Sequence, residues 1–125
     1  MKKGLFLSIS ICMLSALGCT KEKFTGTHSF WYNTETADDL LAYGVDELTL
    51  YVDGVKITTI DAYDHYAADP GCGTGNFVYT DPMFKKEHKT HGYRIVDEAD
   101  SLIFEGTFQM IQKESCSSTK LALTF

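Results

Sequence analysis

Several features are scarce in this chain of 125 residues, and each absence excludes a class of protein. The chain has two prolines and no Ser/Gly-rich run, which argues against a Pro-rich segment or a flexible linker between domains. Acidic residues outnumber basic ones by 17 to 11, which argues against nucleic acid as a partner. No nucleophile elbow, zinc-protease helix motif, P-loop or dinucleotide fingerprint is present. We therefore expect neither an enzyme nor a cofactor-binding protein.

A short apolar segment lies near the start of the chain. Lys2 and Lys3 precede an apolar run from Leu5 to Leu17. A membrane-spanning helix needs about 20 apolar residues, whereas the core of a signal peptide needs roughly 7–15. The segment therefore predicts a signal peptide.

The residues around Cys19 resemble a bacterial lipobox, the site where a lipoprotein peptidase cuts before a cysteine that carries a diacylglyceryl group. Small residues lead up to this cysteine in the order Ser15, Ala16, Leu17 and Gly18, although the usual pattern has leucine where Ala16 stands. The resemblance implies that residues 1–18 are removed and that Cys19 is the lipid attachment site. Two or more acyl chains anchor a protein stably to its membrane. The alternative is an ordinary signal peptide with an incidental cysteine.

The lipobox also implies a cellular location and a domain organisation. Thr20 stands where an aspartate would retain an enterobacterial lipoprotein in the inner membrane, so we expect an outer-membrane protein, with cell-surface exposure left open. Residues 19–26 are predicted to form the lipidated cysteine and a tether, and residues 27–125 a single domain. Because Lys2 and Lys3 leave with the signal, 9 basic and 17 acidic residues remain, a net charge of −8.

Two cysteines remain for the folded domain. Cys12 lies in the predicted signal and Cys19 takes the lipid, which leaves Cys72 and Cys116. An even pair in an oxidising compartment predicts a disulfide between them. The absence of CxxC spacing argues against the alternative of a metal or redox pair.

The clearest local pattern is a β-hairpin. Leu48–Val52 and Val55–Ile60 are rich in β-formers and flank Asp53-Gly54, the dipeptide favoured in a type I′ turn. This turn predicts that Val52 faces Val55 and Leu50 faces Ile57. The aliphatic residues then share one face of the hairpin, with Thr49 and Lys56 on the other.

The rest of the chain predicts short strands and one helix. Strands are expected over 25–33, 76–80, 91–97 and 102–111, with a last alternating segment at 121–125. Thr36 is the expected cap of a two-turn helix that ends at Gly44. Residues 61–75 and 81–90 are expected to be loops, and 98–101 a turn. About seven short strands with frequent turns predict an all-β, antiparallel β-sandwich with one short helix after the first strand.

The order of these motifs resembles the small surface-lipoprotein sandwiches of Bacteroides-type bacteria and the PEGA-like domains. The resemblance covers roughly residues 47–125. It rests on the 51–60 hairpin, Gly92-Tyr-Arg-Ile, Phe104-Glu-Gly-Thr-Phe108 and Cys116 with a terminal Leu-x-Leu. Thr58 departs from the PEGA pattern, in which glycine is common at that position. Such families imply accessory or binding roles in the cell envelope, with no catalytic residues to transfer.

Candidate ligand contacts lie in the loop over 61–75. Among the many aromatics, Tyr63 and Tyr66 stand out because they lie in a polar loop, whereas Tyr51 lies opposite the aliphatic face of its hairpin. The other aromatics are expected to fill the core. The same loop carries Asp61, Asp64, His65 and Asp69, whose spacing does not match an EF-hand. His88 and His91 lack a third zinc ligand and are expected at the surface. We therefore predict no metal site.

These observations predict a lipid-anchored binding or accessory module of the cell envelope. Its partner would be an envelope protein or a glycan, with membrane contact through the lipid and no contact with nucleic acid. One alternative is a fimbrial or adhesin-like subunit that uses a sheet edge for strand addition. A weaker alternative is a hydrolase whose residues come together from separate loops.

Overall fold

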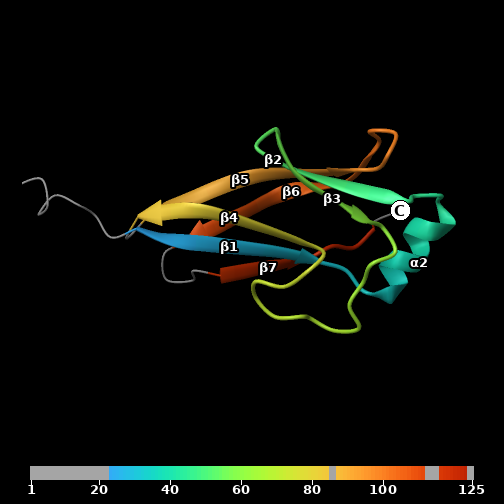
Figure 1. The fold of residues 1–125 in the computed structure, drawn as a ribbon, viewed down its shortest axis with the longest axis horizontal. Coiled ribbons are helices and arrows are strands. Elements are labelled where there is room, and N and C mark those ends of the chain that lie inside the picture. The colour runs from blue at the N-terminus through green and yellow to red at the C-terminus, as the bar shows by residue number, and fades with distance from the viewer. Residues whose placement is uncertain (1–22, 85–86, 112–115, 124–125) are drawn as a thin grey trace, which may run out of the picture.

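The computed structural model describes residues 23–84, 87–111 and 116–123. Seven strands form two sheets, with one helix after the first strand, which confirms the predicted sandwich-like architecture (Figure 1). The elements are β1 (Lys23–Trp31), α2 (Thr34–Ala42), β2 (Glu47–Val52), β3 (Val55–Asp61), β4 (Phe77–Phe84), β5 (His88–Val96), β6 (Leu102–Ile111) and β7 (Cys116–Lys120). In the described part of the chain, no helix is long and apolar enough to cross a membrane.

The two sheets are layered face to face. One has the strand order β4-β1-β7 and the other β3-β2-β5-β6. The chain passes from one sheet to the other at the β1–β2, β3–β4, β4–β5 and β6–β7 connections, so neighbouring strands are mostly distant in sequence. β1 begins at Lys23, within the segment 19–26 that the sequence assigned to a tether. The predicted signal peptide and Cys19 lie outside the described residues.

The β2–β3 hairpin has the predicted turn but a different register beyond it. Asp53 and Gly54 have φ values of 50° and 81°, as a type I′ turn requires, and Val52 pairs with Val55. A register shift then falls between Leu50 and Tyr51, so that Leu50 pairs with Thr58 and not with Ile57. The predicted pairing of Leu50 with Ile57 was wrong because a β-bulge inserts one extra residue into one strand of the pair. The residue types of the two strands do not indicate where such a bulge occurs.

The cap of the helix lies three residues earlier than predicted. The cap is Asn33, whose side chain accepts a hydrogen bond from the Thr36 N–H at 3.1 Å, and Thr36 lies inside the first turn. Asparagine caps as well as threonine does, so the sequence offered two competing start positions. At the other end, Gly44 has a φ of 76° and donates to Leu41 O, while Val45 donates to Leu40 O. These two bonds form a Schellman motif, which terminates α2 near the predicted residue.

Two other predicted boundaries are wrong. Residues 81–84 and 88–90, expected in a loop, belong to β4 and β5. β4 contains Pro82, and within the described residues it pairs only with β1; an edge strand tolerates a residue that lacks an N–H. The last strand among the described residues is β7 at Cys116–Lys120. Of the alternating segment after it, residues 121–123 are not in a strand, although Leu121 is buried, and residues 124–125 lie outside the described residues.

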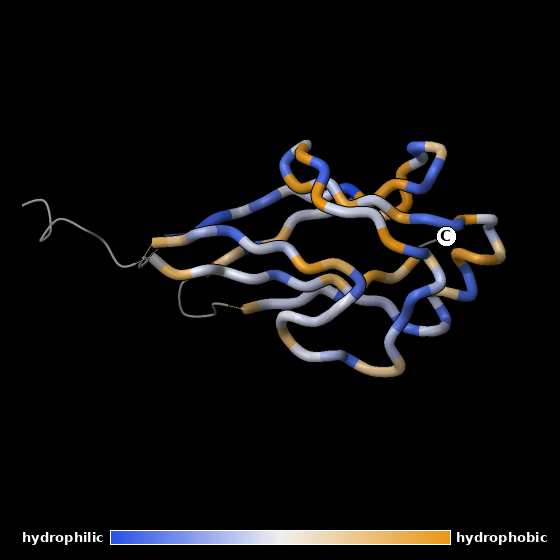
Figure 2. Tube along the Cα trace, in the orientation of Figure 1, coloured by the Kyte–Doolittle hydropathy of each residue, from blue (hydrophilic) through white to orange (hydrophobic). Residues whose placement is uncertain are grey.

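The core lies between the sheets and extends under α2. Hydrophobic and hydrophilic residues alternate along the strands (Figure 2), as expected when one face of each sheet is buried. The largest fully buried side chains come from both sheets and the helix: Tyr32, Phe30, Phe77, Leu40, Leu48, Leu50, Met83, Ile95 and Met110. Tyr32 satisfies its hydroxyl by donating to Ala62 O at 2.8 Å, and burial raises its pKa far above the usual range. Most of the described aromatic residues outside the loop pack in or against the core, as predicted, but Tyr43 and Phe84 are exposed.

Two devices hold β7 beside β1, with which it pairs in parallel. The predicted disulfide joins Cys116, at the start of β7, to Cys72 in the loop between β3 and β4. Closing a loop across 44 positions stabilises the fold by about 3–4 kcal/mol in the chain-entropy model. The second device is His28 of β1, whose ring nitrogens bond to the hydroxyls of Ser117 and Thr119 at 2.6 and 2.7 Å.

His28 makes the stability of the fold depend on pH. The ring is 3% exposed and stacks on Phe108 with 4.3 Å between centroids, and burial lowers its pKa from 6.5 to about 4. The unfolded chain binds a proton at His28 below pH 6.5, whereas the folded chain binds none there until about pH 4. Folding is therefore progressively disfavoured as the pH falls through this window.

We predict that lowering the pH from 7 to 4.5 costs the wild-type chain about 2 kcal/mol more unfolding free energy than it costs His28→Gln. Glutamine keeps a donor and an acceptor near Ser117 and Thr119 but does not titrate. Urea titrations of both chains at the two pH values measure the difference. Equal losses in the two chains would show that His28 does not carry this pH dependence.

Candidate functional site

The turn of the β2–β3 hairpin is fastened to the neighbouring strand β5. The N–H of Asp53 donates to Gly92 O at 2.8 Å, and its Oδ1 accepts from the Gly92 N–H at 2.9 Å. Its Oδ2 accepts from His91 Nδ1 at 2.6 Å. The hydrogen bond from His91, followed by that from Gly92, lowers the pKa of the Asp53 carboxyl. Asp53 thus forms the turn through its left-handed backbone conformation and contacts β5 through its carboxylate.

His91 links this turn to the other sheet. The side chain is almost fully buried, and its Nε2 lies 3.3 Å from Asp81 Oδ2 of β4 without a hydrogen bond in the described residues. Lys89 Nζ contacts the same Asp81 oxygen at 3.1 Å, and this hydrogen bond raises the pKa of Lys89. The ring edges of Tyr79 and Phe108 complete the surroundings of the imidazole. Polar groups from the hairpin, β4 and β5 therefore meet between the two layers.

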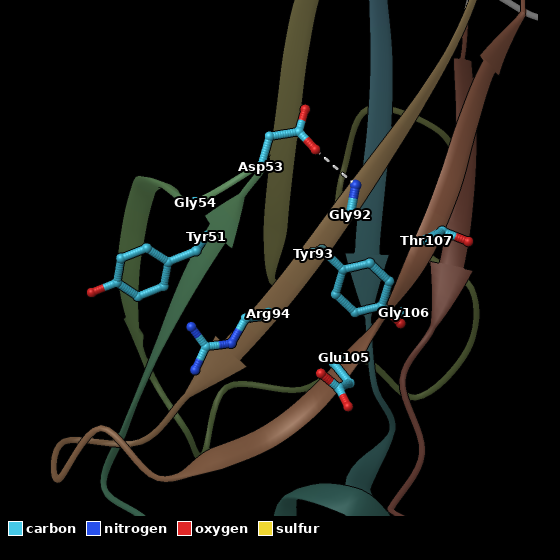
Figure 3. A pocket seen from close by; sticks show the side chains of 9 residues that line it. All are labelled: Tyr51, Asp53, Gly54, Gly92, Tyr93, Arg94, Glu105, Gly106 and Thr107. Atoms are coloured by element: carbon cyan, nitrogen blue, oxygen red, sulfur yellow. Dashed lines mark hydrogen bonds between the residues drawn. The ribbon is translucent and has the colours of Figure 1, made fainter.

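Beside this turn, a shallow groove of about 490 Å³ lies on the four-stranded sheet. Tyr51, Arg94 and Glu105 are directly opposite one another on β2, β5 and β6, so their side chains leave the same face (Figure 3). Gly92 and Thr107 form the next pair along β5 and β6. In the described part of the chain, neither Arg94 nor Glu105 forms an ion pair or a side-chain hydrogen bond. The groove thus presents an aromatic ring and unpaired charges to solvent.

Three glycines line the groove: Gly54 lies in the hairpin turn, and Gly92 and Gly106 lie in strands, where packing treats them differently. A Cβ on Gly106 would lie 2.9 Å from Tyr93 Oη and 3.0 Å from its Cε1. The ring of Tyr93 cannot give way easily, because it packs on Phe30 with 4.8 Å between centroids. A Cβ on Gly92 would meet only Asp53 Oδ1, at 3.9 Å, which is ordinary van der Waals contact. Packing therefore requires the glycine at 106 but not the one at 92.

The residues predicted as ligand contacts lie elsewhere. Tyr63 and Tyr66 are in the loop between β3 and β4, and neither lines the groove. Tyr63 is about half exposed and its ring meets His65 edge-on, while the backbone N–H of Tyr66 donates to Tyr32 O. Whether either tyrosine contacts a ligand stays a prediction.

The acidic side chains of that loop serve local turns. Asp61 Oδ1 accepts from the Tyr63 N–H, and Asp69 Oδ1 accepts from the Gly71 N–H, both at 2.9 Å. Among residues 23–84, 87–111 and 116–123, no three His, Cys, Asp or Glu side chains converge as metal ligands would. Of the two histidines expected at the surface, His88 is exposed, but His91 is buried. The expectation for His91 was wrong because its position in β5 turns it toward the other sheet.

Sequence reasoning identified only part of the groove. Asp53 was recognised as a turn residue and Tyr51 as an outward aromatic, but Arg94 and Glu105 were not singled out. Their proximity depends on the pairing of β2 with β5 and of β5 with β6, which join segments about 45 and 11 positions apart. The available signal was the Gly92-Tyr-Arg-Ile segment, read only as a strand.

Comparisons with known proteins do not assign this chain to a family. No family model matches it. One curated relative, nucleosome assembly protein 1-like 4 from Oryza sativa subsp. japonica, is 30% identical over 128 aligned positions, which cover 86% of this chain. The chain spans only 39% of the length of that protein. The resemblance to PEGA-like domains stays a prediction.

We predict opposite effects for alanine at Gly92 and at Gly106. Gly92→Ala should leave the unfolding free energy unchanged or raise it by roughly 0.5–1 kcal/mol, because glycine is costly within a strand. Gly106→Ala should lower it by about 1–3 kcal/mol, because the Tyr93 ring must move out of its packing. Urea denaturation of both variants measures the difference. A destabilised Gly92→Ala protein would mean that packing, after all, requires that glycine.

Proposed function

We propose that the protein is a lipid-anchored binding module of the bacterial cell envelope, without catalytic activity of its own. Its ligand is an envelope protein or a glycan, bound at the groove on the four-stranded sheet. The observation that carries this proposal is the groove itself, where Tyr51, Arg94 and Glu105 stand side by side with unpaired charges. Small-molecule sites combine an aromatic surface with a few polar groups in this way.

The proposed anchor places this domain close to the outer membrane. Four positions separate Cys19 from Lys23, where β1 begins, and an extended chain of that length reaches at most about 14 Å. β1 then runs toward the end of the sandwich where α2 lies (Figure 1). The domain would therefore stand near the lipid surface with its long strands leading away from it.

Strand addition is the second candidate. β6 is an edge strand, and a second groove of about 440 Å³ runs between it and the segment after β7. The exposed side chain of Leu102 and the backbone of Ile103 lie along that edge. An added strand from a partner would pair with β6, as in donor-strand complexes. This observation favours a structural subunit only if the partner proves to contact β6.

We predict that Cys19 carries the lipid. Growing the native host with an alkyne-tagged palmitate should label the wild-type chain, and Cys19→Ala should lose the label and leave the membrane fraction. Cys12→Ala is the matched control, because that cysteine lies in the predicted signal, and it should keep the label. Undiminished labelling of Cys19→Ala would refute the anchor and with it the proposed address.

We predict that a partner can be captured from the groove in intact cells. A photoreactive phenylalanine analogue replaces Thr107 at the groove in one full-length chain and Tyr63 on the distant loop in another. Irradiation should give one dominant, saturable adduct from position 107, which lines the groove, whereas an adduct from position 63 alone would place the ligand at the loop.

The composition of the adduct separates the candidates. A glycan or an identified envelope protein at position 107 supports the binding module. Capture only when the analogue replaces Leu102, at the β6 edge, would support strand addition instead. Absence of an adduct from positions 107, 63 and 102 would contradict both functions.

A further inference from the structure

We propose that the groove binds a neutral carbohydrate and that Gly92 keeps its floor open for a sugar ring. This inference rests on the proposed binding function and names the ligand class for that same site. Four observations carry it: a glycine that neither φ nor packing requires, a mixed set of hydrogen-bonding groups, an outward aromatic ring and a net negative local charge.

Gly92 is the described glycine that neither backbone conformation nor packing explains. Four of the described glycines have positive φ values, which glycine adopts most easily: Gly44, Gly54, Gly71 and Gly73. At Gly26, Gly75 and Gly106, a Cβ would approach another atom to within 2.6, 2.5 and 2.9 Å. Among the described glycines, only Gly92 combines room for a Cβ with a φ outside the positive range. Because Gly92 has no side chain, its backbone is exposed in the lining of the groove.

The groups around this patch suit hydroxyls. Arg94 supplies donors only, Glu105 supplies acceptors only, and the Thr107 hydroxyl does both. A sugar hydroxyl can donate and accept hydrogen bonds at the same time. It therefore matches a site with both donors and acceptors better than a site with donors alone or acceptors alone. The three side chains come from adjacent strands and the first two are directly opposite one another, so they can reach neighbouring hydroxyls of one ring.

Tyr51 supplies the apolar contact. The apolar faces of sugar rings stack on aromatic side chains, and tyrosine offers such a face with a polar tip. Tyr51 is directly opposite Arg94 and lies on the outer face of β2, where its ring is partly exposed (Figure 3). A ring resting on the Gly92 backbone would therefore have Tyr51 at its side.

The charge of the groove favours a neutral ligand over an acidic one. Arg94 brings one positive charge, while Glu105 and Asp53 bring two negative charges, and the chain as a whole carries −6. The Asp53 carboxylate stays ionised because its hydrogen bonds lower its pKa. Uronic acids and phosphorylated glycans would meet this net negative field, whereas a neutral glycan would not. At about 490 Å³, the groove is in the size range of small-ligand sites.

Affinity electrophoresis of the full-length chain tests the inference. Native gels contain dextran, mannan, xyloglucan or arabinoxylan as neutral probes, and polygalacturonate as the acidic one. We expect at least one neutral polysaccharide to retard the wild-type protein, and polygalacturonate not to. Gly92→Val should weaken the retardation at least tenfold by filling the floor, and Tyr51→Ala should do so by removing the stacking ring.

Matched controls keep folding and binding apart. Lys56→Ala alters the residue opposite Tyr51 on β3, which does not line the groove, and should bind as the wild type does. Tyr51 is not in the buried core, so Tyr51→Ala reports on binding even where Gly92→Val is destabilised in a urea titration.

Each remaining outcome overturns the inference. Retention by polygalacturonate alone would refute the charge argument, and neutral binding unchanged in both variants would place the site elsewhere. No retention by any probe, together with an envelope protein captured from position 107, would refute the carbohydrate while the proposed binding function stands. No retention and no capture would refute both.

Discussion

The carboxylate of Asp53 is the contact on which the arrangement of the groove depends. It sits in a left-handed turn and bonds to both the backbone of Gly92 and the ring of His91. The first bond holds the end of the hairpin against β5, so that Tyr51 and Arg94 remain side by side. The second holds the hairpin to an almost fully buried imidazole, whose Nε2 lies 3.3 Å from Asp81 Oδ2 of the other sheet. One short side chain thus couples the local turn, the pairing of β2 with β5, and the packing of the two layers.

The part of the fold that was predictable from sequence is the part set by local patterns. Alternation of apolar residues placed β6 at its observed bounds, and Asp53-Gly54 identified the hairpin turn. The disulfide followed from counting cysteines once the first two were assigned elsewhere. These features depend on periodicity or on turn chemistry within a few residues, which a single sequence records directly.

The features that were missed depend on pairing between distant segments. The bulge near Leu50, the parallel pairing of β7 with β1 and the burial of His91 leave no trace in composition. The place of Pro82 within a strand has a related cause, since a strand tolerates proline only where that strand lies at the edge of a sheet. The groove falls in the same class, because Arg94 and Glu105 become neighbours only through the order of β2, β5 and β6. A surface assembled across strands is visible only after the register is known.

The position of the groove agrees with an anchor at Cys19. The start of β1 pairs with the end of β4, since Lys23 lies opposite Phe84, so a lipid at Cys19 would sit beside the β4–β5 end of the sandwich. The residues that line the groove instead belong to the four-stranded sheet and to its β2–β3 turn. If a domain is tethered at one end, only that end faces the lipid, and its sides remain exposed to solvent. A ligand could therefore reach Tyr51 and Gly92 without the domain leaving the membrane, which a binding face at the β4–β5 end would not permit.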